Sequence, residues 1–230
     1  MARSVNAVRR SQADRTEISD QRMAEAAVRL LLQKGVRGTT LAELGKQAGY
    51  SRGLATHRFG SKAGLLRHVL QRASARWLAL LQSKVGDKVG AEALCAAVDA
   101  HLELLRHSPD DVRVMYLLWF SSIDPGSDYR ANVARVNAAQ RDDIRRWIQL
   151  GQQRDLVAAD IDADRVAEQF CASMVGMACQ WLVNEKMPLL EMHQHLKTDI
   201  RQRLAAANRT PARASRIKSK GNQDDRRLHI

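Results

Sequence analysis

Residues 42–62, AELGKQAGYSRGLATHRFGSK, place many hydrogen-bond donors beside a short turn. Hydroxyl, guanidinium, imidazole and ammonium groups follow one another at Ser51, Arg52, Thr56, His57, Arg58 and Lys62. Side chains of these types donate hydrogen bonds to phosphate oxygens, and Arg and Lys also neutralise the phosphate charge. The pattern therefore indicates contact with a polyanion, provided that the local fold turns these side chains to one side.

Two short helices joined by a tight turn are expected to carry this cluster. The order Thr-x-x-Glu at Thr40 and Glu43 predicts a capping box, in which each side chain caps the other's backbone amide, and a helix over 41–48. The glycine that follows can adopt the left-handed conformation that ends a helix. Ser51 is then a favourable N-cap for a second helix over 52–59. A turn of about three residues between two such helices is the geometry of a helix-turn-helix.

The rest of the chain predicts helices with clear breaks between them. An apolar stripe between Ile18 and Lys34 predicts a first helix that stops at Gly35, and a stripe of over four turns predicts a long helix over 62–84. Five more helices are expected at about 91–107, 110–122, 128–154, 164–185 and 189–206. The 45% hydrophobic content suffices for a core. We predict an all-α fold, with an N-terminal three-helix helix-turn-helix domain joined by a long helix to a larger helical domain.

The net charge of +12 is concentrated at the two ends of the chain. Residues 1–62 carry 12 Lys and Arg against 5 Asp and Glu, and residues 208–230 carry 7 against 2. The stretch between them carries 18 of each sign. This distribution fits a polyanion-binding head and a basic tail on a neutral body. Basic ends that only aid solubility are the alternative, because a high pI says little about specificity.

Other classes of function find little support in the sequence. Cys95, Cys171 and Cys179 have no C-x-x-C spacing, which indicates neither a disulfide framework nor a zinc site and fits a reducing cytoplasm. No run approaches the roughly 18 apolar residues of a membrane span. No Gly-rich phosphate loop, G-x-S-x-G or H-E-x-x-H occurs, and His193 and His195 fall on different faces of a helix. We predict a protein that is not an enzyme and has no metal, no cofactor and no membrane contact.

The segments KGVRGTT, LAELGKQAG, YSRGLATHRF and GSKAGLL, in this order, resemble the N-terminal DNA-binding domain of TetR-family transcriptional regulators. The resemblance covers about residues 16–70 as a motif, and the order of nine helices extends it loosely over the rest. It rests on positions that match together, namely Gly35, Thr39, Thr40, Ala48, Gly49, Ser51, Gly53, Phe59, Ser61, Lys62 and Leu65. The family usually has Tyr where this chain has Thr56 and often His where it has Arg58.

This resemblance assigns roles within the cluster. Phosphate contacts are expected from Thr40, Thr56, Arg58 and Lys62, together with the amides that Ser61 exposes at the start of the next helix. Base readout is expected from Arg52, which can reach guanine in the major groove. The candidate DNA-binding residues are Thr40, Tyr50, Ser51, Arg52, Gly53, Leu54, Thr56, His57, Arg58 and Lys62. A solvated helix face is the alternative for each of these side chains.

The domain division follows from the same observations. We assign residues 1–15 to a basic disordered arm, with or without DNA contact, and residues 16–70 to the helix-turn-helix DNA-binding domain. Residues 71–207 form the ligand-binding and dimerisation domain that the resemblance implies. Residues 208–230 are a basic tail with few apolar residues, which should stay unfolded.

A homodimer is expected through the last two helices. The helix over 164–185 has two adjacent apolar stripes, too wide an arc for cover on one side: Val166, Phe170, Met174, Met177 and Trp181, and beside them Ala167, Cys171, Val175, Ala178 and Leu182. The resemblance implies a four-helix interface between two subunits, to which the last helix would supply Met192, Leu196, Ile200 and Leu204. Paired recognition helices about 34 Å apart would then suit double-stranded DNA with a near-palindromic operator.

The resemblance also implies a cavity for a small hydrophobic ligand of unknown identity. The candidate lining residues are His101, Met115, Trp119, Phe120, Trp147, Phe170, Met174 and Met177. Ordinary core packing is the alternative, since Met and aromatic stripes more often form core. The implied function is a sequence-specific transcriptional regulator, a repressor released by its ligand through a population shift that the helix over 62–84 transmits. A ligand-independent regulator, an activator or a non-specific basic nucleic-acid-binding protein are the alternatives.

Overall fold

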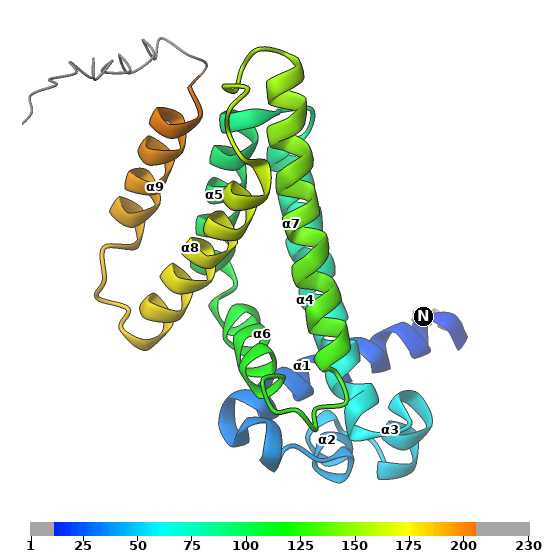
Figure 1. Ribbon diagram of the computed structural model, residues 1–230. Helices are drawn as coiled ribbons and strands as arrows, with labels where there is room; N and C mark the ends of the chain where they lie inside the picture. Colours follow the sequence, from blue (N-terminus) through cyan, green and yellow to red (C-terminus); the bar gives the residue numbers. More distant parts are fainter. Residues whose placement is uncertain (1–11, 206–230) are drawn as a thin grey trace, which may run out of the picture.

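The computed structural model describes residues 12–205, and Figure 1 shows a small helical head below an elongated helical body. The helices of this range are α1 (Gln12–Gly38), α2 (Leu41–Ala48), α3 (Arg52–Phe59), α4 (Lys62–Val85), α5 (Gly90–His107), α6 (Pro109–Ser121), α7 (Arg130–Gln153), α8 (Ala163–Val183) and α9 (Leu189–Leu204). Outside them, Val157 and Ala205 form an isolated antiparallel bridge. We call α1–α3 with the first half of α4 the head, and the remainder the body. The predicted all-α architecture is confirmed.

Helix caps and one glycine set the path of the chain through the head. The hydroxyls of Thr40, Ser51 and Ser61 each accept the backbone amide three residues ahead, at 3.2, 3.1 and 3.1 Å. Gly49 ends α2 with φ 77°, in the left-handed region that favours glycine. These short-range bonds give α2, α3 and α4 abrupt starts, so that three helices fold back on α1 within a short length of chain.

The predicted capping box at Thr40 is only half formed. The Thr40 hydroxyl caps the amide of Glu43, but the Glu43 carboxylate bonds with the ammonium group of Lys34 on α1 and accepts the Thr40 hydroxyl at 3.3 Å. The hydrogen bond from Lys34 lowers the pKa of Glu43. An ion pair between helices has therefore replaced the second half of the local motif.

The start of the first helix differs from the prediction. Helix α1 begins at Gln12, earlier than the predicted start near Ile18, so Gln12–Arg15 form its first turn instead of belonging to the arm. The helical geometry is interrupted at Gly35, with φ 66° and ψ −178°, which is the predicted stop. Residues 1–11 of the predicted arm, and the predicted tail, lie outside the described residues.

Helix α6 packs against the head as well as the body. Val114 and Leu118 of α6 are buried in the head core with α1, α2, α3 and α4, and Tyr129 and Val133 at the start of α7 join them. Asp111 of α6 also pairs with Arg76 of α4. The head is thus fixed to the body by side-chain packing and not only by the continuous helix α4.

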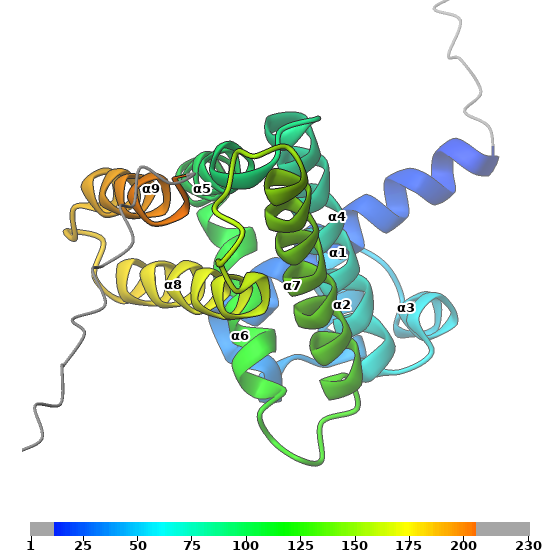
Figure 2. The same ribbon diagram turned by 45° about the horizontal axis from the view of Figure 1, so that its top comes forward.

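The body is arranged around α5, which packs against α4, α7 and α9. Leu94, Val98 and Ile148 are fully buried in its larger core. Helices α8 and α9 form one flank of the body (Figures 1 and 2). The α9 stripe predicted for a dimer partner packs instead on the chain's own core, where Ile200 and Leu204 are buried, because α5 covers it. None of the helices within residues 12–205 combines the length and apolarity that crossing a membrane requires.

A substitution at Gly64 tests the tight turn between α3 and α4. A Cβ added there would lie 1.9 Å from the carbonyl oxygen of Phe59, so the backbone must shift. Gly53→Ala is the matched control, since the closest atom to its Cβ would be the Ser51 hydroxyl at an ordinary 3.7 Å. In urea unfolding we expect Gly64→Ala to lower the free energy of unfolding by about 1–3 kcal/mol. Gly53→Ala should leave it unchanged or raise it by up to about 1 kcal/mol. Equal effects of the two variants would contradict this turn geometry.

Candidate nucleic-acid interface and body cavity

Helix α3 buries one face and exposes the other. Ala55 is fully buried in the head core, whereas Arg52, Gly53, Thr56 and His57 are exposed. Helices α2 and α3 lie at the end of the molecule that is opposite the loop between α7 and α8 (Figure 1). The predicted recognition residues are therefore presented outward, on one side of a short helix.

The position of α3 against α2 depends on a glycine that the sequence analysis did not single out. A Cβ on Gly45 would lie 2.9 Å from the carbonyl oxygen of Ser51 and 3.0 Å from that of Tyr50. The Tyr50 amide donates to the Gly45 carbonyl oxygen at 2.8 Å. A glycine inside a helix of only eight residues is the signal that indicates this close approach.

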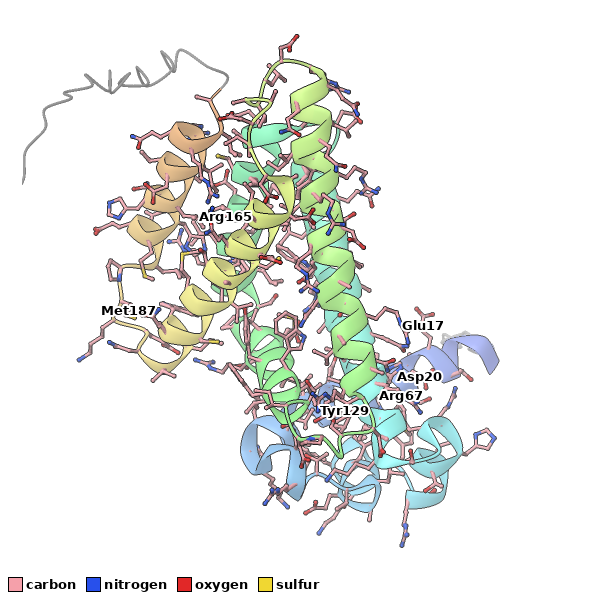
Figure 3. All side chains as sticks on the ribbon, in the orientation of Figure 1. Glu17, Asp20, Arg67, Tyr129, Arg165 and Met187 are labelled. Carbon is pink, nitrogen blue, oxygen red and sulfur yellow. The ribbon has the colours of Figure 1, made fainter. Side chains whose placement is uncertain are left out.

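Two of the predicted phosphate-binding side chains are held by the protein itself. Arg58 is half-buried and donates to the Asp20 carboxylate at 3.3 Å and to the Ser19 hydroxyl at 3.4 Å, which links α3 to α1. Lys62 donates to the Arg37 carbonyl oxygen at 3.0 Å. Figure 3 shows Asp20 on α1, close to the head end of α4.

The other predicted contacts differ in how free they are. Within residues 12–205 no side-chain hydrogen bond engages Arg52, Thr56 or His57. Thr40 is exposed but its hydroxyl serves as a cap, as does that of Ser51. Tyr50 and Leu54 are partly buried. The cluster thus separates into side chains that position α3 and side chains that are available to a ligand.

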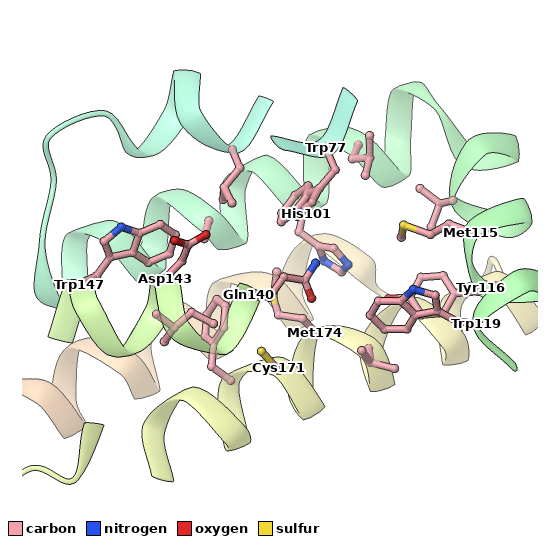
Figure 4. A pocket seen from close by; sticks show the side chains of 17 residues that line it. Trp77, His101, Met115, Tyr116, Trp119, Gln140, Asp143, Trp147, Cys171 and Met174 are labelled. Atoms are coloured by element: carbon pink, nitrogen blue, oxygen red, sulfur yellow. The ribbon is translucent and has the colours of Figure 1, made fainter. Parts of the chain in front are cut away.

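A cavity lies in the body, between α4, α5, α6, α7 and α8 (Figure 4). Each helix contributes residues at helical spacing, so that one face of it forms a wall. The lining residues are Trp77, Leu81, Ala97, His101, Leu104, Val112, Met115, Tyr116, Trp119, Gln140, Asp143, Ile144, Trp147, Phe170, Cys171, Met174 and Val175. His101 lies near the middle of this lining, with Trp147 and Asp143 toward one end and Met115, Tyr116 and Trp119 toward the other.

Six of the eight predicted lining residues are at this cavity, and two lie elsewhere. Phe120 is 54% exposed and borders a surface groove beside the loop between α6 and α7. It follows Trp119 directly, so it points about 100° further round the helix. Met177 is buried in the larger body core, outside the cavity lining.

The sequence analysis missed several lining residues. Trp77 lies in the apolar stripe that predicts the helix over 62–84, where it is hard to tell from core, and Tyr116 lies one turn before Trp119. Gln140 and Asp143 are polar residues on the same face as Trp147, a break in an apolar stripe that indicates a site rather than a core.

Two buried histidines from distant parts of the chain are hydrogen-bonded beside the cavity. Nδ1 of His101 lies 3.0 Å from Nε2 of His193, and Nδ1 of His193 lies 2.7 Å from the carbonyl oxygen of Leu189. A carbonyl only accepts, so His193 carries its proton on Nδ1 and its Nε2 accepts in turn. His101 must then carry its own proton on Nδ1, which leaves its Nε2 as an acceptor.

Burial keeps both imidazoles neutral. It lowers the pKa of His101 to about 3, with a further contribution from His193, and it lowers the pKa of His193 too. Burial also raises the pKa of Tyr116, which therefore stays protonated. Asp143 is the one charged residue of the lining described here. Among residues 12–205 no group of three His, Cys, Asp or Glu side chains could hold a metal ion.

Comparison with known proteins relates the head to a family. Residues 24–69 match the family model described as bacterial regulatory proteins, tetR family. The HTH-type transcriptional regulator BetI of Paraburkholderia phymatum is 30% identical over 112 residues, which are 46% of this chain and 56% of that protein. A BetI of Burkholderia ambifaria is 31% identical over 112 residues, with the same shares. The chain therefore spans a little over half the length of the curated relatives that it matches.

Solved structures share the fold over most of the chain. A TetR transcriptional regulator from Chloroflexus aurantiacus superposes with a TM-score of 0.72 at 24% identity, over 84% of this chain and 98% of that one. A transcriptional regulator from Saccharomonospora viridis, solved in complex with choline, gives 0.68 at 22% identity, over 84% and 100%. FadR from Bacillus subtilis, solved with stearoyl-CoA, gives 0.69 at 15% identity, over 80% and 99%.

The buried His101 should make folding stability depend on pH in mild acid. The pKa of His101 is about 3 in the folded chain against an ordinary 6.5, so between these values the unfolded chain binds a proton that the folded chain does not. Stability is therefore unaffected above pH 6.5 and falls below it, by about 1.4 kcal/mol per pH unit from this group. His101→Gln removes the titration, so its urea-unfolding free energy should fall less than that of wild type between about pH 6.5 and 5. Parallel pH profiles would show that His101 is not held neutral.

Proposed function

We propose that this chain, a TetR-family transcriptional regulator, is a repressor that binds an operator sequence specifically and is released from it by a small ligand. The observation that carries the proposal is the exposed side of α3, where Arg52, Thr56 and His57 stand outward on a helix-turn-helix that the family model matches. The relatives named above are transcriptional regulators, which favours a regulator over an enzyme for this chain. A repressor acts where the chromosome lies, so we place the protein in the cytoplasm.

The structure suggests which hydrogen-bond donors of the head contact bases and which contact phosphates. Arg52 is long, exposed and free to reach guanine in the major groove, with His57 five residues further along α3. Thr56 would bind a phosphate and set the register, and Lys62 keeps two ammonium hydrogens for a phosphate beyond its bond to the Arg37 carbonyl oxygen. Thr40 would donate to a phosphate only by giving up its bond to the Glu43 carboxylate. Arg58 would reach a phosphate only by giving up its bonds to Asp20 and Ser19, so its main part in binding is to hold α3 at a fixed angle on α1.

The flank formed by α8 and α9 is the surface that we assign to a second copy of the chain. Its outward side carries small and apolar residues: Ala172 is exposed, a Cβ on Gly176 would meet nothing within 4 Å, and Val183 is 90% exposed. On α9, Leu190 is 47% exposed. Small residues allow two helices to approach closely, and an apolar flank gains free energy when a partner covers it. A two-fold dimer would present two copies of α3 to successive major grooves of a near-palindromic operator.

Helix α6 contacts both the cavity and the head core, so a bound ligand could affect the position of the head. On α6, Met115 and Trp119 face the cavity, whereas Val114 and Leu118 lie in the head core. Trp77 of α4 also lines the cavity. A ligand that fits one arrangement of α4 and α6 better than another would shift the population of head positions by its difference in affinity. The ligands named for the two neighbours, choline and stearoyl-CoA, differ greatly in size and charge, so the shared fold leaves the ligand open.

Replacement of Arg52 tests sequence-specific binding. A titration of duplex DNA from around the protein's own gene, with scrambled duplex in parallel at several salt concentrations, should show a preference for the native sequence. Arg52→Ala should weaken binding to the native duplex by about 1–3 kcal/mol, roughly 5- to 150-fold, and reduce that preference. Arg154→Ala is the control, because it removes the same charge from an exposed position at the C-terminal end of α7, away from both the head and the α8–α9 flank.

The outcomes of this titration separate the proposed function from its alternative. Arg154→Ala should leave the preference unchanged. If both duplexes bind alike at every salt concentration, and selection from random DNA also enriches no sequence, the head is a non-specific basic surface and the proposed function is wrong.

A charge placed on the α8–α9 flank tests the dimer. Ala172→Glu should convert the dimer to a monomer in light scattering at micromolar concentration, because the interface would have to bury an unpaired carboxylate. Ala139→Glu makes the same change at an exposed position of α7 and should leave the mass unchanged. A monomeric wild type that also binds DNA as a single copy would contradict the proposed interface.

A further inference from the structure

We infer that the body cavity binds an apolar molecule that carries a hydroxyl group and no negative charge, and that this hydroxyl donates its hydrogen to Nε2 of His101. The inference rests on the proposed function only in taking the cavity as the ligand site. It assigns to that site a chemical class of ligand and the atom that recognises it.

The first step is the fixed tautomer of His101. The Leu189 carbonyl oxygen determines the proton position on His193, and His193 determines the proton position on His101. Nε2 of His101 points away from His193 because the two nitrogens of an imidazole ring diverge, and it carries a lone pair. The side chain is a cavity-lining residue that is only 7% exposed, and Nε2 has no hydrogen-bond partner within residues 12–205.

An unpaired acceptor in such a place favours a ligand that donates. A buried polar group without a partner loses its hydration and gains nothing in return, and a donor from a ligand restores the lost bond. His101 cannot supply the proton itself in a neutral solution, because burial keeps its pKa near 3. The donor must therefore come from the ligand.

The neighbouring lining residues indicate that the donating group also accepts. The indole N–H groups of Trp77 and Trp119 are buried and have no acceptor within residues 12–205. A hydroxyl donates one hydrogen and accepts through two lone pairs, so it can bond to Nε2 of His101 and to an indole N–H at once. An ether accepts only, and an ammonium group donates only.

The charges of the lining exclude an anion. No Lys or Arg belongs to it, Asp143 is its one charged residue, and Asp143 already pairs with Arg146 on its own helix at 2.5 Å. A carboxylate or phosphate in the cavity would lose its hydration without gaining a cation, and the carboxylate of Asp143 would repel it. The remaining wall is largely aromatic and apolar, which suits a hydrocarbon body.

The inference is tested with three matched probes on the full chain. Phenylbutanol, phenylbutyl methyl ether and phenylbutyrate share one hydrocarbon body and differ in the polar end. Titration calorimetry with wild type should show that the alcohol binds about tenfold more tightly than the ether, the effect of one buried hydrogen bond. The carboxylate should bind most weakly. Alcohol and ether of equal affinity, a tighter carboxylate, or no binding of the alcohol up to its solubility limit would each overturn the inference.

Two variants locate the effect at His101. His101→Phe keeps a flat ring but has no Nε2, so the alcohol and the ether should bind to it within about twofold of each other. Met174→Leu changes another lining residue without touching a polar group, and it should preserve the tenfold preference. If His101→Phe does not fold, the wild-type comparison still decides.

A spectroscopic measurement checks the tautomer directly. In an imidazole ¹⁵N–¹H correlation spectrum of wild type, both histidines should carry the proton on Nδ1, and the Nε2 signal of His101 should shift when phenylbutanol is added. A proton on Nε2 of His101 would overturn the inference. If these tests fail while the protein still binds DNA sequence-specifically, only the inferred ligand class is wrong. If the alcohol preference holds but the protein shows no DNA sequence preference, only the proposed function is wrong.

Discussion

The packing of α6 between the head and the cavity is the constraint on which the rest of the structure depends. Val112, Met115, Tyr116 and Trp119 fall on one side of this helix and line the cavity, while Val114 and Leu118 fall on the other and complete the head core. A close-packed interior cannot absorb a shift on one side of a helix without a shift on the other. A ligand that displaced α6 would therefore also displace its contacts in the head core. Asp111 of α6 pairs with Arg76 of α4, which adds a contact between the two helices.

A second constraint acts in the head, where some side chains must hold α3 in place and others must stay free to contact DNA. A recognition helix must hold its angle while it exposes donors, and eight residues of helix cannot hold an angle alone. Arg58 contributes to the first requirement through Asp20 and Ser19 on α1, and Gly45 contributes by letting α2 and α3 approach closely. Arg52 is then free for the second requirement. The ten candidate DNA-binding residues are thus not equivalent, although all of them lie in one stretch of sequence.

Local signals in the sequence predicted the helices. Most features that could not be predicted depend on contacts between residues far apart in the sequence. Thr40, Ser51, Ser61 and the glycines act within a few residues, so the helix starts and stops near them could be predicted. Glu43 could not be placed correctly, because Lys34 competes for its carboxylate from another helix. The pairing of His101 with His193 joins positions 92 apart in the sequence, and no spacing rule connects them. Phe120 was misplaced because the pattern around it is apolar throughout, so that periodicity cannot tell the wall of a cavity from the surface next to it.

The same histidine pair joins the cavity to the flank that we assign to the dimer. His101 belongs to α5 and His193 to α9, and α9 packs mainly on α5 and makes little contact with α8. A ligand hydroxyl on His101 would therefore bond to a ring that holds α9 in place. The hydrogen bonds from Leu189 through His193 to His101 have one direction, because each fixes the donor and acceptor of the next. Trp77 packs against two of the three clusters of buried residues, and so do Met115 and Trp119, and all three side chains line the cavity. If two copies meet through α8 and α9, a ligand that shifted these side chains would act on both requirements of operator binding, the angle of each head and the spacing between heads.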